Sequence, residues 1–499
     1  MKRMKWLALL AVFGLMTAAC SAAEEAADPA IDAAEEAVED AVGGGDDSGG
    51  DSDDDSGGDS DDDSGGDSDD GGDDSGGDDG DDEAADAGDG VVFDFGVTED
   101  SIRVGLNADL SGVFVGLVSP IVDAQRAYFD RLNENGGIDG REVQLVIMDT
   151  SFDVPTHLDN YAEFAEESAN GVVMISQSTG SPHTSAIAPE LADDDLIAIP
   201  LSWYSGWADQ ELGANVFELY TNYCFEAMNA IEFLAGNSPA DAPTVGIVTL
   251  PGEYGQDNAA GAKIAAAELG LEIVFDGEGA LGGEDPSGVV SELVAADPDI
   301  VYIASSPGIL AQVLGGAAAQ GLDAIWSGSS LSYNPSLLGT EVAPAIDAFY
   351  FHSTYAALWN ANDSVGMQDM VATLTERVPQ GTYAIADSYV FGWTEAIFTE
   401  AVLRQASSNG DLTRAGVVAA ANEVTVDFQG LAPDQTWVGE PNDFAVRGSF
   451  IYDITLADAT LETSITQPGS AGFSLLAENF VGEVAAGHEF NEPCFISEG

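Results

Sequence analysis

A run of hydroxyl-bearing residues, Ser176-Gln177-Ser178-Thr179-Gly180-Ser181-Pro182, follows the apolar stretch Val172 to Ile175. The apolar stretch predicts a buried strand, and Pro182 suits the first turn of a helix. A strand end followed by a helix start presents hydroxyls and free backbone N–H groups to one point. The chemistry offered is therefore the binding of a carboxylate or a carbonyl. The alternative is a polar loop that only caps its helix.

Sequence signatures of catalysis are missing from the chain. It contains no G-x-S-x-G elbow, no P-loop and no H-E-x-x-H. One G-x-G-x-x-G occurs at Gly277, Gly279 and Gly282, but the acidic residues around it would repel a pyrophosphate, which favours a glycine-rich turn. The four histidines are too far apart in sequence to indicate a metal site: His157, His183, His352 and His488. We therefore expect no enzyme, no cofactor and no metal.

The elements that would position a binding site begin at Ile102. The apolar run Ile102 to Ala108 predicts a strand, Ile121 to Leu132 has helical spacing, and Val143 to Met148 predicts a second strand. Strand, helix and strand in this order form a right-handed parallel unit, and open α/β sheets bind ligands at the carboxyl ends of their strands. The loop Asp109 to Leu117 is therefore a candidate site loop.

The same stretch carries a family resemblance. Leu110-Ser111-Gly112, Asn135-Gly136-Gly137-Ile138 with Gly140, and Asp149 resemble the solute-binding proteins of ABC importers, in particular the leucine/isoleucine/valine-binding type. The resemblance runs from about Ser101 to about Asp458. It implies an α/β protein of the type I periplasmic binding protein fold, with two doubly wound parallel-sheet lobes joined by three hinge strands. It also implies a monomer that binds a small molecule and docks on ABC permease subunits in the membrane.

The resemblance also assigns lobes and ligand-binding residues. Lobe 1 would comprise residues 96–220 with 353–443, lobe 2 residues 221–352 with 444–470, and residues 471–499 would form a C-terminal extension. The loop after Val172 to Ile175 would hold the ligand's carboxylate through Thr179, with Ser178 beside it. The full set of expected ligand-binding residues is Ser178, Thr179, Ser202, Tyr204, Tyr254, Ser306, Ser329 and Tyr389.

This chain departs from the amino-acid binders near Ser329. Those proteins carry an acidic residue there that pairs with the ligand's ammonium group, and this chain has none. An ammonium group buried without a counter-charge is costly. Either Glu253, Asp387 or Asp109 takes that role, or the ligand has no ammonium group. We expect an importer component that captures a branched-chain amino acid or a related amide or carboxylate, or else a receptor that reports a small molecule to a signalling partner.

The N-terminus predicts export. Met1 to Cys20 has basic residues followed by the uncharged stretch Trp6 to Ala19, which is too short to cross a membrane and indicates a signal peptide. Thr17-Ala18-Ala19-Cys20 resembles a lipobox, so we expect a lipid on Cys20 and attachment to the outer face of the cell membrane. Ordinary secretion with cleavage nearby is the alternative.

Residues 21–95 are predicted to be a disordered acidic linker of Asp, Ser and Gly. Calcium binding by Asp51, Asp53 and Asp55 is disfavoured because Ser56 stands where an EF-hand needs glycine. The formal net charge of −77 excludes nucleic-acid binding.

In an oxidising compartment, the remaining cysteines, Cys224 and Cys494, are expected to form a disulfide; two buried thiols are the alternative.

Overall fold

The computed structural model describes residues 85–86, 90–209, 212–283, 285–378, 388–456 and 472–496. These residues all belong to the compact unit Ala84–Gly499. The predicted signal peptide, Cys20, most of the acidic linker and Asp387 lie outside the described residues.

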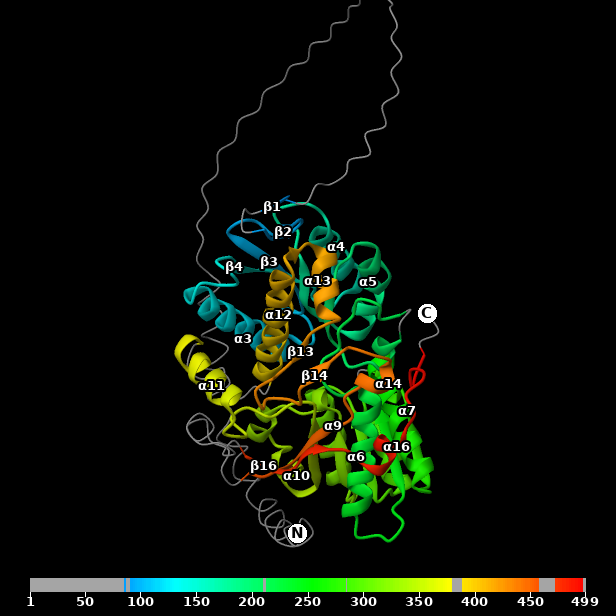
Figure 1. The fold of residues 1–499 in the computed structure, drawn as a ribbon. Coiled ribbons are helices and arrows are strands. Elements are labelled where there is room, and N and C mark those ends of the chain that lie inside the picture. The colour runs from blue at the N-terminus through cyan, green and yellow to red at the C-terminus, as the bar shows by residue number, and fades with distance from the viewer. Residues whose placement is uncertain are drawn as a thin grey trace, which may run out of the picture. The chain divides into compact units, whose positions relative to one another are not determined.

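A four-stranded parallel sheet holds the first predicted strands, in the order β4-β3-β5-β6 (Figure 1). Its strands are β3 Ser101–Ala108, β4 Glu142–Asp149, β5 Met174–Thr179 and β6 Ala198–Leu201. Helices α3 Val115–Glu134, α4 Val154–Ala165 and α5 Ser181–Asp193 alternate with these strands along the chain. The long helix α12, Tyr389–Asn409, packs against α3. The strand-helix-strand unit predicted from Ile102 onwards is therefore confirmed.

A seven-stranded sheet has the order β16-β15-β11-β10-β9-β7-β8. Five strands run parallel: β7 Val245–Thr249, β8 Ile273–Gly277, β9 Ile300–Ala304, β10 Ile325–Gly328 and β11 Tyr350–Thr354. At one side, β15 Ser449–Ile454 and β16 Phe473–Phe480 are antiparallel. Residues assigned to a C-terminal extension thus supply the edge strand β16.

Small residues let two helices of this sheet approach closely. Helix α6, Tyr223–Asn237, packs against α7, Glu253–Glu268, whose buried face is rich in alanine. A Cβ on Gly261 would lie 2.2 Å from the backbone oxygen of Cys224. Only glycine allows that contact, which places α6 and α7 as one tightly packed pair.

The remaining helices and strands are shorter or lie outside the two main sheets. They are α8 Ser287–Ala296, α9 Pro307–Ala319, α10 Ala343–Phe349, α11 Val365–Arg377, α13 Arg414–Ala421, α14 Pro441–Phe444, α16 Glu483–Gly487, β1 Ala85–Asp86, β2 Val92–Phe93, β12 Asp411–Leu412, β13 Thr425–Val426 and β14 Gln435–Thr436. Short 3-10 turns span Ser205–Ala208, Ala280–Gly282, Ser330–Ser332 and Pro335–Gly339.

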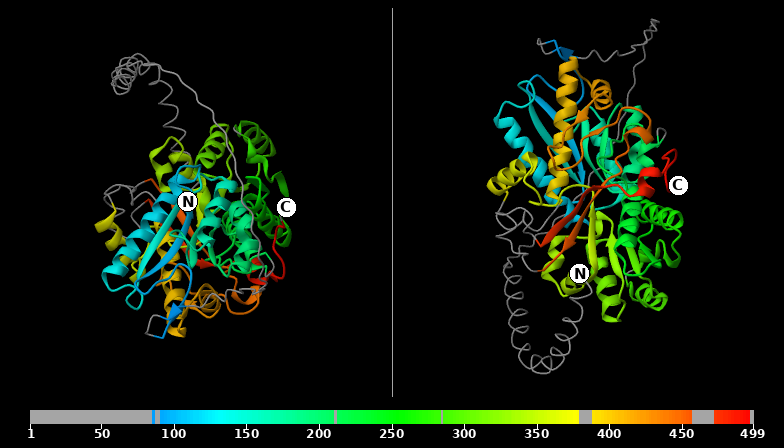
Figure 2. Two further views of the ribbon diagram at one scale, coloured as in Figure 1. Left: turned by 90° about the horizontal axis from the view of Figure 1, so that it is seen from above. Right: turned by 60° about the horizontal axis from the view of Figure 1, so that its bottom comes forward.

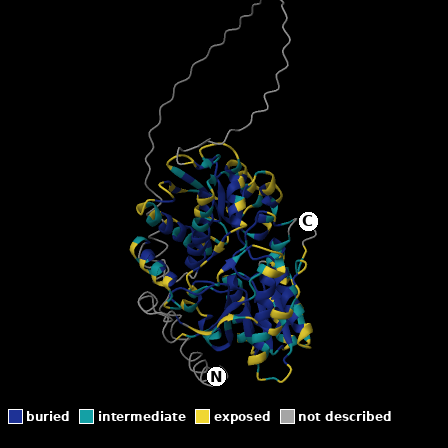
Figure 3. Cartoon of the chain, in the orientation of Figure 1, coloured by how far each residue is buried: buried dark blue, intermediate teal, exposed yellow. Residues whose placement is uncertain are grey.

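The chain passes between the two sheets three times: after β6, after β11 and before β15 (Figure 2). Figure 3 shows that buried residues line both sheets. The predicted α/β class with two largely parallel sheets is confirmed, although the first of the three crossings contains no hinge strand. In the described residues no helix has the length and apolar character needed to cross a bilayer.

Two local expectations from the sequence differ from the structure. Val216 to Leu219 is not a strand, because only Val216 forms an isolated bridge with Ala198. Helix α7 begins at Glu253, five residues before the expected Asn258. Gly252 has a φ of 82°, which lets the chain turn into the helix directly after β7.

The disulfide expected between Cys224 and Cys494 is present. It joins α6 to the segment after α16 across a sequence separation of 270. The C-terminal residues are therefore tied covalently to the start of α6.

Candidate ligand-binding site

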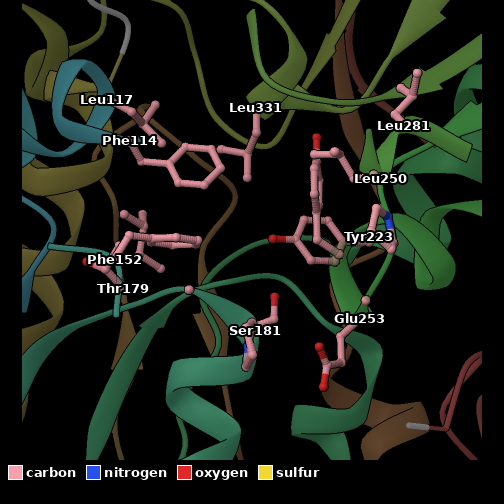
Figure 4. A pocket seen from close by; sticks show the side chains of 17 residues that line it. Phe114, Leu117, Phe152, Thr179, Ser181, Tyr223, Leu250, Glu253, Leu281 and Leu331 are labelled. Atoms are coloured by element: carbon pink, nitrogen blue, oxygen red, sulfur yellow. The ribbon is translucent and has the colours of Figure 1, made fainter. Parts of the chain in front are cut away.

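A cavity of about 340 Å³ lies between the carboxyl ends of strands from both sheets (Figure 4). From the first sheet it receives the ends of β5 and β6, and from the second the segment after β7. Its lining consists of Phe114, Leu117, Phe152, Thr179, Gly180, Ser181, Pro182, Leu201, Tyr223, Leu250, Pro251, Gly252, Glu253, Tyr254, Leu281, Gly282 and Leu331. This is the place where open α/β sheets bind ligands.

Two helices begin at the cavity, one from each sheet. Helix α5 starts at Ser181 and α7 starts at Glu253. The residues before them, Gly180 and Gly252, provide no side-chain cap for the first N–H groups. The N-terminus of a helix carries free N–H donors and a partial positive charge, so the start of α5 favours an anionic or strongly polar ligand group. At the start of α7, the acidic Glu253 in the first turn offsets that positive charge.

Three hydroxyl groups meet at one end of the cavity. The Ser181 Oγ and Ser202 Oγ atoms lie 2.6 Å apart. Burial raises the pKa of Tyr223 well above its ordinary value, while hydrogen bonding to these two serines opposes the rise. In Figure 4 the Ser181 and Tyr223 hydroxyls point toward the same part of the cavity. Since Tyr223 stays neutral, this hydroxyl cluster (Ser181, Ser202 and Tyr223) offers hydrogen bonds without charge.

The rest of the cavity has apolar walls. The rings of Phe114 and Phe152 meet edge to face with centroids 4.8 Å apart, and Leu331 lies beside them in Figure 4. The Tyr254 ring packs at 5.0 Å from that of Tyr223, and its hydroxyl donates to the Ser305 carbonyl at 3.0 Å. Glu253 is the one charged residue of this lining. The cavity therefore suits a ligand that is mostly apolar with one polar end.

Two of the predicted site residues, Thr179 and Tyr254, line the cavity. Ser202 belongs to the hydroxyl cluster behind Ser181. Ser178 is buried, and its hydroxyl forms hydrogen bonds with His157 Nε2 at 3.1 Å and with the Thr184 hydroxyl at 2.8 Å. Adjacent residues of a strand point to opposite faces, so Ser178 and Thr179 of β5 do not share one cavity.

The other predicted residues lie outside the lining. The Tyr204 hydroxyl donates to the Phe495 carbonyl at 2.7 Å. Ser306 precedes α9 and accepts from the Ile309 N–H, and the Ser329 hydroxyl lies 3.1 Å from that of Tyr355. The Tyr389 ring is buried against that of Trp359.

Glu226 on α6 places an acidic side chain beside Ser329 and Ser330. Its Oε1 accepts from the Ser330 N–H at 2.7 Å, and its Oε2 is buried with no hydrogen-bond partner among the described residues. Burial raises the pKa of Glu226 to about 8, against the Ser330 hydrogen bond, so this carboxyl is largely neutral at pH 7. The sequence offered one signal, a glutamate within the otherwise apolar Tyr223 to Ala227.

The other acids considered for an ammonium group have different surroundings. Glu253 lines the cavity. Asp109 is buried and accepts from the N–H groups of Gly112 and Phe114, so it orders the start of α3. Within the described parts of the chain, no group of three or more His, Cys, Asp or Glu side chains could hold a metal ion.

Comparison with known proteins agrees with this architecture. The family model described as "Periplasmic binding protein" matches residues 101–460. The chain belongs to this family. Its members are binding proteins that work outside the cytoplasm, and the resemblance noted at Leu110 to Asp149 is confirmed. The chain is a substrate-binding protein of the ABC-transporter type.

Two solved structures share the fold. The fatty acid ABC transporter substrate-binding protein from Thermomonospora curvata is 26% identical, with a TM-score of 0.71 over 81% of this chain and 98% of that chain. The branched chain amino acid ABC transporter from Thermus thermophilus with bound valine is 18% identical, with a TM-score of 0.64 over 78% of this chain and 98% of that chain.

A curated relative is the chemotactic signal transduction system substrate-binding protein BasB from Halobacterium salinarum. It is 25% identical over 333 residues, which span 65% of this chain and 74% of that protein.

Proposed function

We propose that this chain captures a carboxylate with an apolar chain in the cavity between its sheets and delivers it to an ABC permease. The observation that carries the proposal is the division of the cavity. A hydroxyl cluster and a helix N-terminus form one end, and phenylalanine and leucine side chains form the rest. The ligand class of the Thermomonospora curvata protein, a fatty acid, supports the same division.

The polar end fits a carboxylate. Ser181 stands at the first position of α5, where backbone N–H groups and its own hydroxyl are available together, and Tyr223 adds a neutral donor from α6. Hydrogen bonds to a charged group contribute about 1.5–3 kcal/mol each. A branched-chain amino acid is the second candidate, because Glu253 could face its ammonium group.

Ligand binding would couple to closure of the cleft. Phe152 and Ser181 follow strands of the first sheet, whereas Tyr254 and Leu331 follow strands of the second, and Tyr223 begins the helix that precedes β7. A ligand gains all these contacts only when both sides meet, so binding favours the closed form. The permease would recognise that form.

The first prediction concerns the ligand series. We expect octanoate to raise the melting temperature of the purified chain more than butanoate, because each buried CH₂ group contributes about 0.8 kcal/mol. A ligand at 100 times its dissociation constant adds about 2.7 kcal/mol of stability, a visible shift. A thermal-shift assay with octanoate, butanoate, octylamine and leucine tests this. Stabilisation by leucine without any by octanoate would reject the apolar-carboxylate assignment.

The second prediction concerns the polar end. The double variant Ser181→Ala with Tyr223→Phe is expected to bind octanoate at least tenfold more weakly, since it removes two hydrogen bonds to the carboxylate. Calorimetric titration measures the change. Ser291→Ala, on the exposed side of α8, is the matched control and should bind as the original chain does. Equal affinity in the double variant and the control would contradict the anchor role.

The third prediction concerns membrane attachment, which we propose through a lipid on Cys20 followed by the acidic linker. Cys20→Ser removes the thiol that is acylated, so the variant is expected in the culture or periplasmic fraction instead of the membrane fraction. Immunoblots of both fractions give the answer. A variant that stays with the membrane as fully as the original chain would exclude the lipid anchor.

Reporting to a signalling partner is the second candidate function, favoured by the similarity to a chemotactic substrate-binding protein. Transport and sensing can be separated by measuring the uptake of labelled octanoate by cells with and without the chain. Transport requires that uptake fall when the chain is lost. Unchanged uptake with a lost swimming response would favour sensing. In either role we propose that the chain acts as a monomer.

A further inference from the structure

A second cavity of about 270 Å³ lies beside the first crossing between the sheets. Its walls come from the segment that follows β6, from β14 and from the residues around α14, and the C-terminal segment contributes Phe490. It is separate from the ligand cavity. Trp207 lines the second cavity, and its Nε1 donates to the Ser202 Oγ at 3.2 Å. The Ser202 Oγ in turn lies 2.6 Å from the Oγ of Ser181, which lines the ligand cavity.

The partly buried side chain of Glu218 stands in this wall. Glu218 Oε1 is buried and has no hydrogen bond within the described residues. The Glu218 carbonyl accepts from Gln435 Nε2 and from Trp437 Nε1, both at 3.0 Å, which fixes the residue beside the cavity. A carboxyl with one buried and unpaired oxygen is costly to ionise, and burial, with the nearby Asp257, raises the pKa of Glu218 well above its ordinary value. A bound cation would offset that cost.

The charged residues that line this cavity are all acidic. Besides Glu218, the lining includes Asp209, and it includes no lysine or arginine. A neutral or anionic occupant would leave the Glu218 carboxyl protonated, whereas a cation would favour its ionised form and would be attracted by both acids.

Aromatic rings make up much of the remaining wall. The lining includes Trp207, Phe217, Tyr220, Trp437, Phe444 and Phe490. The faces of aromatic rings attract cations, and cages of such rings bind quaternary ammonium groups. A bare metal ion would gain little from these rings, so the wall selects an organic cation.

We propose that this hinge-side cavity binds a small organic cation with a quaternary ammonium group, paired with Glu218 and surrounded by aromatic rings. The site goes beyond the carboxylate-binding function proposed for the cleft. Its position next to the first crossing, where Tyr220 N–H donates to Gln435 Oε1 at 2.8 Å, places the cation against a segment that joins the two sheets.

The test uses the full chain with choline chloride as the probe, titrated by calorimetry against a background of equimolar potassium chloride. We expect saturable binding with one site per chain. Glu218→Gln keeps the size of the side chain and removes its charge, so it should weaken choline binding by about tenfold or more. The melting temperature of this variant shows that it is folded. Glu292→Gln makes the same change at an exposed position on α8 and should bind choline as the original chain does.

Three results would overturn the proposal. Equal weakening in Glu218→Gln and Glu292→Gln would mean that choline responds to net charge alone. If Glu253→Gln loses choline binding while Glu218→Gln binds choline as the original chain does, the cation lies in the cleft. Absence of saturable binding in the original chain would mean that the cavity takes no such cation. None of these depends on whether octanoate binds, so the two proposals fail separately.

Discussion

Glu226→Gln is expected to stabilise the chain at pH 9 and to leave its stability nearly unchanged at pH 5. The Glu226 carboxyl is buried beside Ser330, and its pKa is raised to about 8 from an ordinary 4.5. Glutamine has a similar size and shape, keeps an oxygen that accepts from the Ser330 N–H, and carries no charge at any pH.

The direction follows from proton linkage. A raised pKa means that the folded chain binds a proton more tightly than the unfolded chain at this residue. The stability from the neutral carboxyl is therefore fully present below pH 4.5 and is lost as the pH rises toward 8. The loss in the original chain amounts to a few kcal/mol, because each pKa unit corresponds to about 1.4 kcal/mol.

Urea unfolding at pH 5, 7 and 9 measures this difference. The free energy of unfolding of the variant, minus that of the original chain, should increase from pH 5 to pH 9. Glu292→Gln, whose carboxyl is exposed on α8, should show a constant difference over the same range. A Glu226→Gln curve parallel to that of the original chain would show that Glu226 is ionised in the folded protein.

The strands that carry the site could be predicted because their sequences are almost uninterrupted apolar runs. Ile102 to Ala108 is β3 with one added residue, and the carboxyl ends of β5 and β6 do face the cavity. Parallel strands buried on both faces have this pattern, and their order follows from right-handed connections. The type of fold and the side of the sheet that binds ligand were therefore accessible from the sequence.

The direction of single side chains was not accessible. Ser178 and Thr179 are chemically similar neighbours, and only the register of β5 determines that Thr179 reaches the cavity. Glu226 was hidden for another reason. It lies far from Ser329 in sequence, and only the packing of α6 against the end of β10 brings its carboxyl to the Ser330 N–H. Neither contact leaves a periodic signal.

The C-terminal residues show a third limit. A family resemblance ending near Asp458 left residues 471–499 without a role, yet they supply β16 and the bonded Cys494. The Cys494 N–H donates to the Ser205 Oγ at 2.9 Å, and that hydroxyl donates to Asp257 Oδ1 at 2.6 Å. The tail thus holds the loop after β6 against α7, close to Ser202.

Cys494→Ala is therefore expected to lower the free energy of unfolding by about 3–5 kcal/mol. The bond closes a loop with a sequence separation of 270, and the entropy that a disulfide removes from the unfolded chain grows with loop length. Urea unfolding in the absence of reductant measures the loss. Dithiothreitol should destabilise the original chain and leave the variant unchanged, because the variant has no bond left to reduce.

The same variant tests whether the tail supports the cleft. Once the bond is lost, the tail can leave Ser205 and Tyr204, whose hydroxyl donates to the Phe495 carbonyl. The loop that carries Ser202 then loses its support, so octanoate affinity should fall together with stability. If the stability falls while the affinity at a temperature well below unfolding stays the same, the disulfide serves folding alone. If neither changes, the contacts of Phe490 with α6 are sufficient to hold the tail in place.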